Sequence, residues 1–325
     1  MPSSIVHNYF AQDLINNINN KNYKIDEKKL CYFAQSTDPF HFYHILKPWK
    51  INGKKIRNFT ETFHTTNCGT FLIKLTKEIK KKNLTNNKEI LSFLYGFTAH
   101  YILDSTVHPY VIYKTGKFIS NIKETHKYNA KHNELEVYLD KYLYEKRENK
   151  KIETYKAYKE LFQIKPFSND LIELLDPIIK EIYNVKNFHK IYYQSLKDMK
   201  FVFHYLRYDP LGILEKSYYI FDKIMPSSIL NSKFLSYHYV PKNAYKWLNN
   251  NHKIWYYPMD HSKRFHYSFD ELYIIALKKG KLVLQEIDDY LFQNKKVELE
   301  KIIKNISYTT GIDENIKQEN PKYEF

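Results

Sequence analysis

Histidine and acidic residues recur at four-residue steps in the middle of the chain. His100, Asp104 and His108 follow one another at this step, and His132 and Glu136 repeat it further along. On an α-helix each four-residue step turns the side chain by only about 40°, so the first three side chains can converge on one point. Imidazole nitrogen and carboxylate oxygen are ligands that suit Zn²⁺. The spacing therefore predicts a metal site.

The run of three residues is the rarer part of this pattern. With 14 histidines and 36 acidic residues, chance gives roughly 1.6 acids placed four residues after a histidine. The chain contains three such pairs: His100/Asp104, His132/Glu136 and His266/Asp270. A further histidine four residues beyond the acid is expected only roughly 0.07 times. Single pairs are weak evidence, and Asp270 is expected in a first helical turn, where the helix dipole favours a carboxylate.

Composition narrows the kind of site. The only cysteines are Cys31 and Cys68, and no CxxC motif occurs, so neither a disulfide framework nor a thiolate metal site is indicated. A metal must therefore be held by histidine and carboxylate. The net charge of +15 favours a phosphate-bearing partner such as nucleic acid or an anionic membrane surface. The lysines are scattered, however, and an AT-rich codon usage explains the charge equally well.

No targeting signal is visible in the N-terminal sequence, so none is expected. Residues 1–7 lack the charged and apolar regions of a signal peptide, and no apolar run of about 18 residues follows. We therefore expect a cytoplasmic protein that does not span a membrane, and peripheral contact with a membrane surface stays open. No obligate protein partner is indicated.

Helical periodicity dominates the sequence, and no Asn-Gly or Asp-Gly turn separates alternating strands, which predicts an all-α fold. The expected helices cover residues 8–20, 26–34, 60–82, 87–108, 127–147, 153–163, 169–184, 187–207, 211–224 and 268–292. Pro109 disfavours the helical conformation at His108, so that helix should end there. A capping-box pattern at Ser268 and Glu271 predicts the start of the last helix. Residues 226–267 are expected to form a long loop packed on helices.

A single multi-helix domain is expected over residues 1–308. The metal ligands fall within residues 1–140, and residues 150–308 supply helical and loop packing. A division near residue 150, within the charged run 145–151, is the alternative. Residues 309–325 are polar and are expected to form a frayed C-terminal tail.

Several short motifs over about residues 1–140 resemble the zinc-dependent phospholipase C family of bacteria. The motifs are Met1-Pro2-Ser3-Ser4-Ile5-Val6-His7, Ser36-Thr37-Asp38-Pro39-Phe40, Phe63-His64, His100 to His108 with Pro109-Tyr110, and His132-Asn133-Glu134-Leu135-Glu136, with a weaker echo at Trp255-Tyr256-Tyr257-Pro258. This resemblance implies an all-helical fold that holds zinc ions in a cleft. Three ions are expected, and two of them are the more secure part of this expectation.

The resemblance also implies a ligand set. The first zinc ion would be held by Asp38, His64, His100 and Asp104. The second would be held by His108, His132 and Glu136. The third would take His7, Asp104 as a shared ligand, and the chain-terminal amine, which becomes that of Pro2 once Met1 is removed. Secreted members expose a tryptophan at this end after signal cleavage, and this chain departs from them there.

The function implied is phosphodiester hydrolysis of the phospholipase C type. Zinc ions would bind the phosphate oxygens and lower the pKa of a bound water, whose attack would release diacylglycerol and a phosphorylated head group. Asp38 would also act catalytically, by orienting or deprotonating that water. The substrate would be a phospholipid or a membrane surface.

Other functions remain open at this point. The single-strand-specific zinc nucleases share this kind of three-zinc helical site, and a basic, tyrosine-rich chain could track single-stranded nucleic acid. A non-catalytic protein could keep the same scaffold for binding a membrane surface or a partner. The histidines could also be structural and hold no metal.

Overall fold

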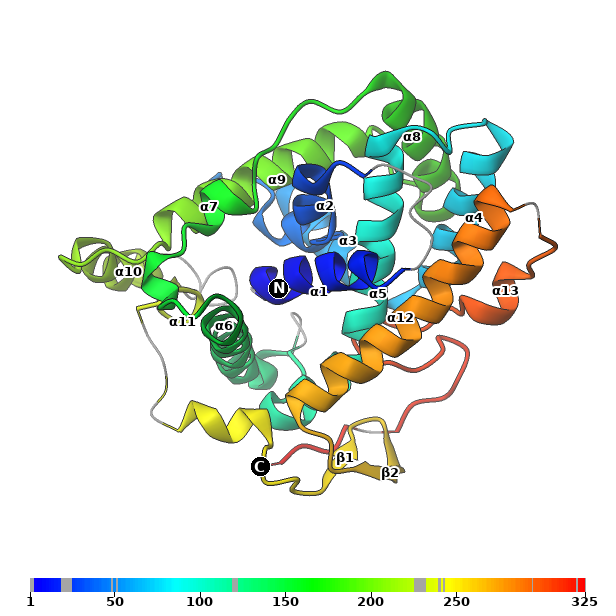
Figure 1. The fold of residues 1–325 in the computed structure, drawn as a ribbon. Helices are drawn as coiled ribbons and strands as arrows, with labels where there is room; N and C mark the ends of the chain where they lie inside the picture. The colour runs from blue at the N-terminus through cyan, green and yellow to red at the C-terminus, as the bar shows by residue number, and fades with distance from the viewer. Residues whose placement is uncertain are drawn as a thin grey trace.

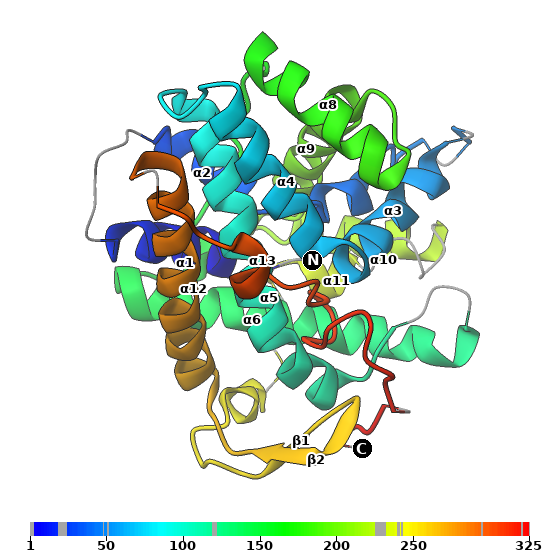
Figure 2. The same ribbon diagram turned by 90° about the vertical axis from the view of Figure 1, so that its right-hand side faces the viewer.

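The computed structural model describes residues 3–18, 25–47, 49–50, 52–118, 122–224, 232–238, 241, 243–293, 295–319 and 321–324. Helices occupy most of this chain (Figures 1 and 2), which confirms the all-α prediction. The principal helices are α1 (Ser4–Asn16), α2 (Glu27–Phe33), α3 (Gly53–Thr65), α4 (Cys68–Lys81), α5 (Lys88–Thr115), α6 (His126–Glu148), α8 (Asn169–Tyr183), α9 (Phe188–Tyr205), α10 (Ile213–Ile224) and α12 (Phe269–Phe292). Shorter helical segments are η1 (Asp38–Phe42), η2 (Lys123–Thr125), η3 (Ile152–Thr154), α7 (Ala157–Glu160), α11 (Ser232–Leu235), η4 (Ala244–Leu248) and α13 (Leu299–Ile302).

Helix α5 lies at the centre of the fold. It is apolar around most of its circumference, so it can be stable only when other elements cover all of its faces. The helices α1, α2, α4, α6 and α12 pack against it, and Figure 1 shows α1 and α12 crossing it. The histidine and aspartate side chains of α5 are therefore buried and need polar partners.

Three of the predicted helices differ from the structure. The helix expected over residues 153–163 consists of two short segments only, η3 and α7. Residues 60–82 form the end of α3 and the whole of α4, because the chain breaks at Asn67, which adopts a left-handed conformation (φ 54°) that asparagine tolerates. Helix α5 does not end at His108 but continues through Pro109 to Thr115. Burial of Tyr110, Val111 and Ile112 outweighs the cost of a proline inside a helix, about 3 kcal/mol.

The segment predicted as a long loop contains more regular structure than expected. Its described part includes α11, η4 and an antiparallel pair of strands, β1 (Trp255–Tyr257) and β2 (Asp260–Phe265). The buried Trp255 anchors this pair, and its indole N–H donates to the Tyr267 carbonyl (3.2 Å). Pro258 and Met259 form the turn between the two strands. Pro-Met is not one of the dipeptides that indicate a hairpin in a sequence.

The C-terminal segment is not frayed, contrary to the prediction. The backbone N–H of Glu319 donates to Met259, that of Lys322 to Pro258, and that of Glu324 to Tyr113, at 2.9–3.1 Å. These bonds hold Glu319, Lys322 and Glu324 against the strand pair and the end of α5. Backbone pairing of this kind leaves no side-chain pattern that a sequence could reveal.

The hydrophobic core is shared by both halves of the chain. One large cluster of buried side chains extends from Ile5 to Tyr308 and includes residues before and after position 150. The extent of the domain stays a prediction. Within the described residues, no helix is long and apolar enough to cross a membrane.

Candidate metal centre

Five elements bring eight of the predicted ligands together. Helix α5 carries His100, Asp104 and His108 on one face, as the four-residue spacing requires. The other ligands come from α1 (His7), η1 (Asp38), α3 (His64) and α6 (His132, Glu136). Pro2, the remaining predicted ligand, lies outside the described residues.

One group of ligands, which we name the closed cluster, consists of His7, Asp38, His64 and His100. The ligand atoms of His7, Asp38 and His100 lie within 4.8 Å of one another. The Asp38 carboxylate lies 3.5 Å from His64 Nε2 and 3.9 Å from His100 Nε2. The His7 ring stacks on that of His100, with centroids 4.1 Å apart. All four side chains are buried within the described part of the structure.

A second group, the open cluster, consists of His108, His132 and Glu136. Its ligand atoms also lie within 4.8 Å of one another. Glu136 Oε1 is 3.4 Å from His108 Nε2 and 3.2 Å from His132 Nε2. The His132 side chain is 15% exposed, so this cluster meets solvent on the α6 side.

Asp104 connects the two clusters. Its Oδ1 lies 3.3 Å from His7 Nε2, and its Oδ2 lies 3.0 Å from His100 Nε2 and 3.6 Å from His108 Nδ1. Burial alone would raise the pKa of this carboxyl, but the three histidines hold it well below its usual range. Spacing placed Asp104 between two histidines and the resemblance added His7, and the structure brings all three histidines to this carboxylate.

Among the described residues, several buried polar atoms of the centre have no hydrogen-bond partner. They include His7 Nδ1, His64 Nε2 and Glu136 Oε2. A buried polar atom without a partner costs about 1–3 kcal/mol. Each of these atoms is a good zinc ligand, and a cation would also balance the carboxylates gathered there. The residues present therefore fit zinc.

Backbone carbonyls orient the histidines. His100 Nδ1 donates to the Ala34 carbonyl (2.9 Å), which leaves Nε2 directed at the closed cluster. Helix α2 ends close enough for this bond because Gly96 has no side chain. A Cβ at Gly96 would lie 2.8 Å from Ala34 N and from Phe33 C.

Tyr308, which the sequence did not single out, joins the two clusters from the C-terminal segment. Its N–H donates to the His64 carbonyl (2.7 Å), and its carbonyl accepts from His108 Nδ1 (3.1 Å). Its ring stacks on His64, with centroids 4.9 Å apart. Gly311 lets this segment approach α5, because a Cβ there would lie 2.5 Å from the Ser105 carbonyl oxygen. Backbone contacts of this kind could not be predicted from spacing.

Asp140 is a second residue that the sequence analysis missed. Its buried Oδ1 accepts from the N–H groups of Ile5 and Val6, both at 3.0 Å, in the first turn of α1. These N–H groups have no helical acceptor, so Asp140 satisfies them and ties α1, with His7, to α6. Burial raises the pKa of Asp140 well above its usual range. Its position four residues after Glu136 was a signal that could have identified it.

Other histidine and acid pairs lie outside the centre. Asp270 accepts from Tyr142 and Lys146 and belongs to a helix start at which Ser268 and Glu271 form the predicted capping box. His189 and Asp176 are 2.6 Å apart but adjoin no further ligand of either cluster. Such pairs show that a histidine beside an acid is not by itself a metal site.

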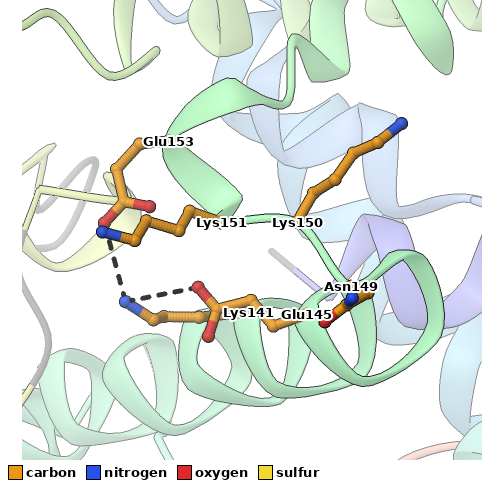
Figure 3. Close-up of a pocket in the computed structure, with 6 residues that line it drawn as sticks. All are labelled: Lys141, Glu145, Asn149, Lys150, Lys151 and Glu153. Carbon is orange, nitrogen blue, oxygen red and sulfur yellow. Dashed lines mark ion pairs between the residues drawn. The ribbon is translucent and has the colours of Figure 1, made fainter.

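A pocket near the end of α6 is separate from the metal centre. Figure 3 shows its lining residues, which include Lys141, Glu145, Lys150, Lys151 and Glu153. Lys141 Nζ lies 3.7 Å from both glutamates, Glu145 and Glu153. The pocket contains no residue of either cluster.

Comparisons with known proteins agree with the geometry. Residues 6–188 match the family model described as zinc-dependent phospholipase C, and this segment contains both clusters and Asp104. No curated protein and no solved structure matched the chain. Because the match covers more than half of the sequence, the chain belongs to the zinc-dependent phospholipase C family.

Proposed function

We propose that this protein is a zinc-dependent phosphodiesterase of the phospholipase C type, which cleaves a phospholipid into diacylglycerol and a phosphorylated head group. The observation that carries this proposal is the arrangement of two ligand clusters joined by one carboxylate, Asp104. Family membership supports the choice of a phospholipid as substrate.

The ligands would divide among three zinc ions. Asp38, His64, His100 and Asp104 would hold one ion. The open cluster, His108, His132 and Glu136, would hold a second. His7 would bind a third together with Asp104 and the terminal amine. The short distances from His7 to Asp104 and to His100 support placing two of these ions close together.

Bound zinc would act as a Lewis acid, offsetting charge on the phosphodiester and making a water molecule nucleophilic near neutral pH. Asp38 would orient that water and accept its proton, because it is the carboxylate that faces both His64 and His100. The Ala34 and Tyr308 carbonyls would hold His100 and His108 in the required tautomers. The exposed edge of the open cluster, at His132, would admit the phosphodiester.

Metal analysis tests the first half of the proposal. Protein purified without chelator should contain at least two equivalents of zinc, and a His132→Ala variant should contain less. A His189→Ala variant is the matched control, since His189 pairs with Asp176 outside both clusters. Absence of zinc from the wild-type protein would refute the proposal.

A product assay tests the second half. Zinc-loaded protein should release diacylglycerol and a phosphorylated head group from mixed phospholipids. Release of nucleotides from single-stranded DNA or RNA, with binding that weakens steeply as salt is added, would identify a nuclease instead. Zinc content without hydrolysis of either substrate would identify a non-catalytic binding protein.

A further inference from the structure

Exposed apolar side chains are concentrated at helix α10, outside the segment that matches the family. Leu211, Ile213, Tyr219 and Ile220 are between 62% and 78% exposed. Exposing this much apolar surface in one short stretch is unfavourable in water unless another surface covers it in use. The patch therefore calls for a partner.

The exposed side chains of Ile213, Tyr219 and Ile220 lie on one side of α10, and the other side of this helix is well anchored. On the anchored side, the buried Tyr218 donates to the Tyr205 carbonyl (3.0 Å), and Ser217 hydrogen-bonds to the Tyr205 hydroxyl (2.8 Å). At 100° per residue, the outward side spans an arc of about 120°. In order around the helix this arc carries Tyr219, Lys223, Lys216, Ile220 and Ile213. Two lysines are thus interleaved with apolar side chains on the exposed face.

A chain of packed helices connects α10 to the metal centre. Helix α10 packs on α11, and α11 packs on α6, which carries His132 and Glu136. Just after α11, the Tyr237 hydroxyl donates to Asp140 on α6 (3.2 Å). Figure 1 shows α10 at the left edge of the molecule, outside α11 and α6. A surface bound to α10 would therefore be connected to the helix of the open cluster through α11.

We propose that this α10 face, formed by Ile213, Lys216, Tyr219, Ile220 and Lys223, docks on the surface of an anionic phospholipid bilayer. The apolar side chains would enter the boundary between head groups and acyl chains, and the lysines would meet lipid phosphates, as in interfacial amphipathic helices. The net charge of +15 adds a general attraction to an anionic surface. This inference rests on the proposed function, since it specifies where the enzyme meets its lipid.

Charge argues against a second copy of the chain as the occupant. Two α10 faces brought together would place Lys216 and Lys223 of one copy against the same lysines of the other. Two chains of net charge +15 also repel each other. An anionic bilayer matches both the apolar and the basic residues of the face.

Vesicle binding tests the proposal. The probe is a vesicle of phosphatidylcholine and phosphatidylserine analogues in which a phosphonate replaces the cleavable ester, so that binding is measured without hydrolysis. We expect zinc-loaded protein to co-sediment with it. The Ile213→Ser/Ile220→Ser variant should bind about tenfold more weakly. The Lys216→Glu/Lys223→Glu variant should lose at least about thirtyfold on anionic vesicles and little on neutral ones.

Helix α12 offers a matched control. Leu282 is 65% exposed there, and Lys281 beside it is also exposed. The Lys281→Glu/Leu282→Ser variant should bind vesicles like the wild type. Equal losses from the α10 and α12 variants would overturn the proposal, as would wild-type binding by the α10 variants. Binding of α10 to an acidic protein, without any vesicle binding, would overturn it as well.

Hydrolysis assays separate this inference from the proposed function. The α10 variants should cleave vesicle lipid more slowly but should cleave a monomeric short-chain phospholipid at the wild-type rate. Slower cleavage of both substrates would indicate damage to the centre and would contradict a docking role. If the wild type binds vesicles through α10 but cleaves no phospholipid, the proposed function fails while the docking inference stands.

Discussion

The closed and the open cluster use the same kinds of ligand but are assembled differently. The closed cluster takes His7, Asp38, His64 and His100 from four separate elements, and all four side chains are buried. The open cluster comes from two neighbouring helices, and one of its ligands, His132, is partly exposed. A ligand set gathered from distant parts of the chain requires the folded core, whereas a set spaced along two helices is largely prepared by local structure. Asp104 contacts histidines of both clusters.

The largest effect on activity is expected from removing the charge of the Asp104 carboxylate, which lies between the two clusters. Asp104→Asn should lower activity at least about a hundredfold, because even outer partners of metal ligands typically contribute 10–100-fold. Zinc content should fall most in the closed cluster, where Asp104 is a proposed ligand of two ions, and less in the open cluster, where Asp104 only adjoins His108. Metal analysis and a lipid assay measure this. Asp176→Asn is the control, because it alters a histidine pair outside the centre. Loss confined to one cluster would show that the two are independent.

Asp140 should matter mainly for the closed cluster, because it holds the helix that carries His7. Asp140→Ala leaves the N–H groups of Ile5 and Val6 without acceptors and should reduce the free energy of unfolding by about 2–4 kcal/mol. Asp140→Asn keeps an acceptor oxygen and should cost much less. Urea denaturation measures the stability. Equal losses of zinc from both clusters would contradict the selective role.

Destabilisation of the closed cluster is also expected from Gly96→Ala. The new Cβ would press on the backbone of Phe33 and Ala34 and shift the carbonyl that orients His100, at a cost of about 1–3 kcal/mol. Gly280→Ala is the matched control. Its new Cβ would lie nearest to side-chain atoms of Leu14 and Ile102, whereas the Cβ at position 96 would meet backbone atoms. Thermal denaturation compares the two. A larger loss from Gly280→Ala would contradict this account.

Chelation should distinguish the two clusters kinetically. Because His132 is the exposed ligand, zinc of the open cluster should leave first, and zinc of the closed cluster should follow in a slower phase. A chromogenic chelator followed over time measures both phases. Release of all zinc in one phase would show that exposure does not separate the clusters.

The stability of the metal-free protein is expected to depend on pH, and this is a smaller effect than those above. Burial would lower the pKa of His108, but the carboxylates of Asp104 and Glu136 raise it to about 9. Burial would raise the pKa of Glu136, but His132 and His108 lower it to about 2. The His108 contribution to stability is therefore complete below its ordinary pKa of 6.5 and is lost as pH rises towards 9. The Glu136 contribution is complete above 4.5 and is lost as pH falls towards 2.

Denaturation of the metal-free protein across this range checks the prediction, and His108→Gln should flatten the decline above pH 6.5. Zinc must displace the His108 proton, so its affinity should rise over the same interval. A zinc affinity that does not change between neutral pH and pH 9 would contradict the ionised state of His108.

Much of the fold and part of the centre could be predicted, and the errors have identifiable causes. Periodicity predicted the all-α class, and spacing placed His100, Asp104 and His108 on one face. The helix boundary at Pro109 was wrong because core burial beyond it outweighed the local cost of proline. Asp38 and His64 have no spacing relation to α5, so only resemblance to a family suggested them.

The sequence by itself determined which side chains could share a helix face, because the α-helix repeat is set by local backbone geometry. It therefore placed His132 and Glu136 on one helix face, and His100, Asp104 and His108 on a face of another helix. Only the tertiary structure decided that His7 stacks on His100, that Asp140 holds α1, and that the backbone of Tyr308 joins the two clusters. Those contacts link residues more than 90 positions apart in the chain, and they exist only because the packed core brings the elements together.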